Sequence, residues 1–155
     1  MGARHEIILH TACLLHDAGQ FISRSSHHKH SQYLISNAEV FGLSANDVML
    51  AALTARYHRR ALPKATHDGY ATLSRADRIV VCKLAAILRI ANVLSRPRIQ
   101  LGGSLEVGLE PGSLVVTARR TSDWTLEQHA VHERANMFRQ VYGRDVVLRD
   151  VHGGS

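Results

Sequence analysis

The sequence is poor in aromatic residues, in cysteine and in long apolar runs, and each shortage argues against a class of function. Aromatic residues make up 5% of the 155 positions, so few side chains can stack on unpaired bases and we do not expect a nucleic-acid partner. The two cysteines, Cys13 and Cys82, lie in apolar helical patterns, which predicts buried thiols in a reducing cytoplasm instead of disulfides. No apolar run approaches the roughly 18 residues that a membrane span needs, and no secretory signal is expected.

Histidine is abundant instead, and the charge is unevenly distributed. Eight of the 11 histidines lie within the first 67 residues. Residues 1–100 hold 13 Lys/Arg against 6 Asp/Glu, a balance of +7, whereas residues 101–155 carry a balance of −1. A basic surface favours a partner with many negative charges, such as a phosphate chain or a nucleotide. The charge alone is explained equally well by a basic face that is merely solvated.

The apolar pattern predicts an α+β protein that is mainly α. Helices are expected over residues 6–17, 28–41, about 45–57 and 74–94, the second with Tyr33, Leu34, Val40 and Phe41 facing inward. After Pro97 the pattern alternates, which predicts strands at 105–109, 114–117 and 146–148 around a helix over 125–142 whose buried stripe starts at Leu126. We therefore expect a helical domain at 1–98 and a small ββαβ unit at 99–155 packed against it.

Two groups of polar residues stand out in the helical part. His16 and Asp17 end the first predicted helix, and a neutral imidazole beside a carboxylate is a donor pair that metal ions and phosphate esters use. The structural alternative is that Asp17 caps nearby backbone or orients His16. Cations gather at two helix ends. At the start of the helix over 28–41 the helix dipole also favours an anion, whereas at the end of the helix over 45–57 it favours the cations themselves. The structural alternative is that both groups are merely solvated. The candidate phosphate contacts are His28, Lys29, His30, Arg56, His58 and Arg59.

Several ordered blocks resemble one known family. They are Leu15-His16-Asp17-Ala18-Gly19, His28-Lys29-His30-Ser31, Arg56-Tyr57-His58-Arg59 and Lys83 to Ala91. Over about residues 4–96 the chain is similar to the C-terminal, HD-type helical region of the exopolyphosphatase / guanosine pentaphosphate phosphohydrolase family (Ppx/GppA). The tail resembles, less specifically, the small α+β segment that follows this region in longer members.

The resemblance implies a helical bundle related to metal-dependent HD phosphohydrolases. Carried over by position, His16 and Asp17 match the metal-binding pair and are the candidate catalytic residues, while His30 and His58 match additional metal ligands. Asn92 stands where a carboxylate is expected, and an amide is a poorer ligand. The expected upstream histidine matches neither His5 nor His10. A divalent Mn, Mg or Zn ion, held weakly, is the cofactor that the resemblance suggests.

The resemblance also assigns the family's hydrolysis to two actin-like domains with Gly-rich phosphate loops, and nothing in these residues matches them. The expected function is an accessory module that binds polyphosphate or a phosphorylated nucleotide and does not hydrolyse polyphosphate alone. One alternative is a degenerate HD phosphohydrolase that uses His16, Asp17, His30 and His58. Another is a structural or dimerisation domain, since a missing helix would leave an apolar face for a homodimer to cover.

Overall fold

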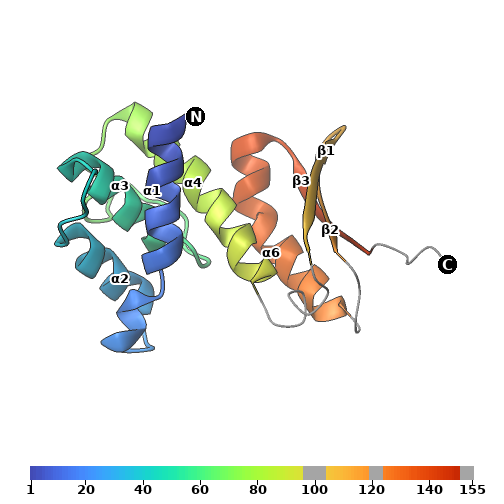
Figure 1. Cartoon of the computed structure of the whole chain (residues 1–155), viewed down its shortest axis with the longest axis horizontal. Coiled ribbons are helices and arrows are strands. Elements are labelled where there is room, and N and C mark those ends of the chain that lie inside the picture. The colour runs from blue at the N-terminus through green and yellow to red at the C-terminus, as the bar shows by residue number, and fades with distance from the viewer. Residues whose placement is uncertain (96–103, 119–123, 151–155) are drawn as a thin grey trace. The chain divides into compact units, whose positions relative to one another are not determined.

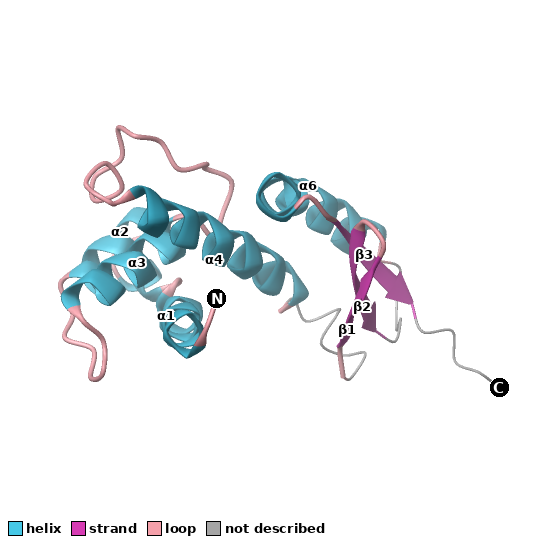
Figure 2. Ribbon diagram, turned by 90° about the horizontal axis from the view of Figure 1, so that it is seen from above, coloured by secondary structure: helices cyan, strands magenta, loops and turns pink. Residues whose placement is uncertain are grey.

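The computed structural model describes residues 1–95, 104–118 and 124–150. The chain forms two compact units, Met1–Leu88 and Arg89–Ser155, and each is described on its own. Helices dominate, and the strands form one small sheet, which confirms the α+β, mainly α class (Figures 1 and 2). The predicted domain boundary at residues 98 and 99 lies outside the described residues and stays a prediction.

The first unit is built around helix α3 (Ala45–Arg56), which contacts both α1 (Ala3–Leu15) and α2 (His27–Ser36). Every residue from Leu50 to Ala55 is buried, so α3 supplies the centre of this core. The helix begins at Ala45 because it is capped there: Ser44 Oγ accepts the Asp47 N–H at 3.2 Å, and the Asp47 carboxylate accepts the Ser44 N–H. Helix α4 (Arg75–Leu94) starts in this unit and continues into the second.

Helix α2 corrects the prediction of a helix over residues 28–41. It ends at Ser36, and Tyr33, Leu34 and Phe41, which were expected to face inward, are exposed. The buried face instead consists of His27, Ser31 and Ile35. These residues are four apart and therefore lie on one side of the helix. The apolar pattern failed here because two of the three inward residues are polar.

The second unit has the predicted ββαβ order. Strand β1 (Glu106–Glu110) pairs antiparallel with β2 (Ser113–Ala118), and β2 pairs in parallel with β3 (Asp145–Asp150) after helix α6 (Thr125–Tyr142) (Figure 2). Gly112 has a φ of 75° in the turn of the hairpin, a conformation that favours glycine. Val116, Leu148 and Phe138 are buried, but Leu126 is exposed, so its place in the buried stripe of α6 was wrong.

No helix in the described part of the chain combines the length and the apolar character that a membrane span needs.

A histidine–aspartate cluster beside a basic patch

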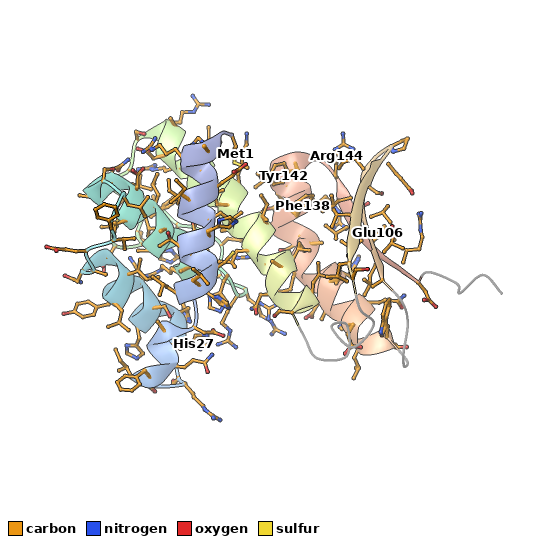
Figure 3. All side chains as sticks on the ribbon, viewed as in Figure 1. Met1, His27, Glu106, Phe138, Tyr142 and Arg144 are labelled. Carbon is orange, nitrogen blue, oxygen red and sulfur yellow. The ribbon has the colours of Figure 1, made fainter. Side chains whose placement is uncertain are left out.

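The segment between α1 and α2 folds back so closely that it brings His16 and Asp17 to the start of α2. The link is the 3-10 helix η1 (Ala18–Phe21), and α2 begins at His27, which Figure 3 labels. Ser31, fully buried, donates its hydroxyl to the carbonyl of His16 at 2.6 Å and accepts the Gly19 N–H at 2.9 Å. One hydroxyl thus fixes the main chain on both sides of Asp17.

Gly19 makes this approach sterically feasible. A Cβ atom built on Gly19 would lie 2.2 Å from the His27 carbonyl oxygen and 2.4 Å from the Ser31 nitrogen, which are backbone atoms that cannot move aside alone. The Asp-x-Gly spacing and the serine of the His-x-His-Ser block therefore belong to one structural device. It sets the position of the imidazoles and of the carboxylate described next.

Four side chains converge there, and we refer to His16, Asp17, His27 and His58 as the cluster. Asp17 Oδ1 lies 3.3 Å from His27 Nε2 and 3.9 Å from His58 Nε2, and Asp17 Oδ2 lies 3.5 Å from His16 Nε2. The Nε2 atoms of His27 and His58 are themselves 3.3 Å apart. The rings of His16 and His58 meet edge to face, with centroids 4.9 Å apart. All three histidines therefore direct the same ring atom toward one carboxylate.

The other ring nitrogen of each histidine is held by the main chain. Each Nδ1 lies within hydrogen-bond distance of a carbonyl oxygen three residues earlier. The pairs are His16 with Cys13 at 2.7 Å, His27 with Arg24 at 3.3 Å and His58 with Ala55 at 2.7 Å. A carbonyl oxygen only accepts, so Nδ1 carries the proton and a neutral ring presents a lone pair at Nε2.

Burial favours the neutral ring of His58. His58 is almost fully buried, and this desolvation lowers its pKa to about 4 even though the Ala55 carbonyl and the Asp17 carboxylate act in the opposite direction. The Nε2 atom of His16 is buried and has no hydrogen-bond partner among the described residues. Asp17 is different, because its side chain is 51% exposed. The cluster thus groups three imidazole rings, whose Nε2 atoms are largely shielded from solvent, with one carboxylate that is half-exposed.

Cations surround the next residue along α2, and we call His28, Lys29, Arg56 and Arg59 the basic patch. Burial lowers the pKa of His28, and the positive charges of Arg59, Arg56 and Lys29 lower it further. Arg56 is held in place by a hydrogen bond from Nη1 to Gln32 Oε1. Within the described residues neither Lys29 nor Arg59 forms an ion pair. The patch is positive and is not neutralised.

The structure thus divides the sequence-predicted residues. It brings His16, Asp17 and His58 together and places His28, Lys29, Arg56 and Arg59 in the patch. His30, predicted as a ligand, is half-buried on the first turn of α2 and makes none of the recorded cluster contacts. Asn92 lies in the second unit, so its role as a ligand stays a prediction. No hydrogen bond or ion pair of Asn92's side chain is recorded among the described residues.

His27 was missed by sequence reasoning. It stands next to His28, Lys29 and His30, and the choice among them needed the inward direction of α2. The spacing of four between His27, Ser31 and Ile35 places them on the inward face of α2. Only Ile35 is apolar, however, so a search for apolar positions did not find this face.

Comparison with known proteins agrees with the motifs. A family model described as Ppx/GppA phosphatase, domain III, matches residues 2–138. The chain belongs to this family. The matched range contains the whole cluster and the whole basic patch, so both lie within the part of the chain that matches this family.

One curated relative of this Ppx/GppA chain is the guanosine-5'-triphosphate,3'-diphosphate pyrophosphatase of Pseudoalteromonas translucida (strain TAC 125). It is 31% identical over 91 residues, which is 59% of this chain and 18% of the relative. The chain therefore aligns with under a fifth of that relative's length, and the relative's name describes the longer protein.

Proposed function

We propose that this chain is an accessory module of a Ppx/GppA-like protein and that it binds polyphosphate or a phosphorylated nucleotide over the basic patch. The observation that carries the proposal is the unneutralised positive charge around His28, where the charges of Arg59, Arg56 and Lys29 act together. A phosphate chain presents closely spaced negative charges, which suits several cations on one surface better than a single ion pair does.

The side chains of the patch are suited to phosphate oxygens. Arg56 is oriented by Gln32 and also lies over the Tyr57 ring, with its guanidinium carbon 5.9 Å from the ring centroid. A guanidinium that is already oriented loses less side-chain entropy when it binds a phosphate. Lys29 and Arg59 are exposed, so they reach a ligand without displacing protein contacts.

Calorimetry with a defined polyphosphate, in buffer containing EDTA to remove metal ions, tests this proposal. We expect binding that weakens with salt and that falls at least tenfold in the double variant Lys29→Gln, Arg59→Gln. The matched control is Arg75→Gln, which removes an exposed cation of the same unit outside the patch and leaves the affinity unchanged. Absence of binding by the unaltered chain, or an equal loss in the control, would overturn the proposal.

A second candidate is a metal-dependent phosphohydrolase, which the cluster favours because its carboxylate is exposed beside three imidazoles. Catalysis would require a firmly held ion with an open coordination position. Turnover of a phosphodiester or nucleotide by the metal-loaded chain tests this candidate, with Asp17→Asn as the inactive comparison. If the loaded chain shows no turnover above that of Asp17→Asn, the module acts by binding alone.

A further inference from the structure

The cluster contains an arrangement of lone pairs that is unfavourable without a cation. The three Nδ1 atoms are committed to main-chain carbonyls, so in neutral rings His27 Nε2 and His58 Nε2 are two acceptors that face each other at 3.3 Å. The oxygens of Asp17 are acceptors as well. One extra proton, on His27 or His58, would supply a donor for the contacts among His27, His58 and Asp17. The buried Nε2 of His16 would still have no hydrogen-bond partner.

We propose that His16, Asp17, His27 and His58 form one site for a divalent transition-metal ion of the zinc class, bound through three Nε2 atoms and one carboxylate. This ligand set differs from the one predicted from the sequence, because His27 takes the place of His30. The proposal does not rest on phosphate binding by the basic patch.

The spacing of the donor atoms fits such an ion. A tetrahedron with metal–ligand bonds of about 2.0–2.1 Å places its donors about 3.3–3.4 Å apart. Two of the four recorded separations, His27–His58 and His27–Asp17, are 3.3 Å, and His16–Asp17 is 3.5 Å. The fourth, His58–Asp17 at 3.9 Å, is the widest of these four. The donor atoms of His16, Asp17 and His58 all lie within 4.8 Å of one another, so these three stand near ligand positions. His27 Nε2 lies beside the donors of His58 and Asp17 but outside that set, so the His27 ring has to shift toward His16 when an ion binds.

The surroundings of the donors support the same conclusion. Imidazoles that bind metals commonly donate their other N–H to a carbonyl or a carboxylate, which fixes the ring and its tautomer. All three cluster histidines have this arrangement, each with a carbonyl three residues earlier. Ser31 adds a further constraint, because it holds the carbonyl of His16 and the N–H of Gly19 on either side of Asp17.

The chemistry of the donors selects the ion. Three neutral nitrogens and one oxygen suit Zn²⁺, Co²⁺ or Ni²⁺, whereas Mg²⁺ and Mn²⁺ prefer sites with more oxygen ligands. This narrows the Mn, Mg or Zn expectation from the sequence to the zinc class. The half-exposed side of Asp17 gives the ion a route from solvent.

Metal binding by the whole chain tests the proposal without any assay of activity. After treatment with a chelator and dialysis, we expect one equivalent of Zn²⁺ to bind in calorimetry. One equivalent of Co²⁺ should give the intense visible absorption of a four-coordinate cobalt centre. Mg²⁺ should not compete at a hundredfold excess over Zn²⁺.

Two histidines of the same helix form the matched pair of variants. His27→Asn should lower the Zn²⁺ affinity by more than about tenfold, which is the lower end of the loss seen when only an outer partner of a ligand is removed. His30→Asn should leave it unchanged. Since His27 is buried and its replacement can disturb folding, Asp17→Asn is the second test, because the half-exposed Asp17 tolerates an amide of the same shape.

The possible outcomes separate cleanly. The site is supported if both His27→Asn and Asp17→Asn lose the cobalt spectrum while His30→Asn keeps it. No stoichiometric binding by the unaltered chain, an unchanged spectrum in a folded Asp17→Asn variant, or loss in His30→Asn alone would overturn it. Since polyphosphate binding is measured in EDTA, failure of the metal site leaves that result unaffected.

Discussion

The Nε2 atoms of His27 and His58 lie 3.3 Å apart although 31 residues separate them in the chain. Both rings are tied by Nδ1 to the main chain, and both contact the exposed carboxylate of Asp17. The pair therefore connects the start of α2 with the residues that follow α3. Each of the two histidines is followed directly by a member of the basic patch, His28 and Arg59 respectively.

Ser31 is expected to stabilise the fold although it is polar. Ser31→Ala leaves the buried Gly19 N–H without an acceptor, which should lower the free energy of unfolding by about 1–3 kcal/mol. Urea denaturation, monitored by circular dichroism, measures this free energy of unfolding. Ser36→Ala, on the same helix but half-buried, is the control and should change stability by less than about 0.5 kcal/mol. Equal effects of the two substitutions would contradict the role given to Ser31.

Gly19 should not tolerate even one added methyl group. In Gly19→Ala the new Cβ meets the backbone of His27 and Ser31, and the forced separation of η1 from α2 should cost about 1–3 kcal/mol. Gly108→Ala is the comparison, because nothing lies near a Cβ at that exposed position. Thermal unfolding of both variants measures the difference in their stability. A Gly19→Ala protein as stable as the Gly108→Ala protein would show that the close approach is absent in solution.

Asp47 should make stability depend on pH in the acid range. Burial tends to raise its pKa, but the hydrogen bonds from Ser44 and Arg4 outweigh burial and hold the pKa below its ordinary value of 3.8. A depressed pKa means that the stabilisation is present above the unfolded-state pKa and is lost as pH falls through the folded-state value. Asp47→Asn should cost about 1–2 kcal/mol at pH 7.

The two curves of unfolding free energy against pH should approach each other as pH falls below 3.8, and they should meet once the Asp47 carboxyl is protonated in the folded protein. Asp68→Asn removes an exposed carboxylate and should leave the curve of the unaltered protein in place. A constant difference between Asp47→Asn and the unaltered protein down to pH 2.5 would contradict the assignment, although roughly 0.5 kcal/mol of residual difference is within expectation.

Phosphate-chain binding should report the number of patch cations through its salt dependence. Each cation that pairs with a phosphate releases counterions, so Arg59→Gln should lower both the affinity and the slope of log affinity against log salt, the slope by about 1. Titrations between about 50 and 200 mM salt measure this slope. An unchanged slope, as expected for the Arg75→Gln control, would remove Arg59 from the contact surface.

Much of the molecule was predictable because its signals are local. The predicted helix over about 45–57 and the predicted strands at 105–109 and 114–117 are present. They depend on residues close in sequence: the Ser44–Asp47 cap, the apolar run of α3 and the Pro111–Gly112 turn. The course of α2 was not predictable in the same way. Its inward face carries His27 and Ser31, which a count of apolar residues assigns to the surface, whereas Tyr33 and Phe41 are exposed.

The sequence by itself determined the family, the mainly α class and the candidate residues His16, Asp17 and His58, because these follow from motifs and from periodicity. Only the tertiary structure decided that His27 completes the cluster and that His30 does not. The physical reason is the contact of η1 with α2, where Gly19 and Ser31 hold two main-chain segments against each other. That contact joins residues 12 to 15 positions apart, and it directs one histidine of the His27–His30 run inward while its neighbours face the basic patch and solvent.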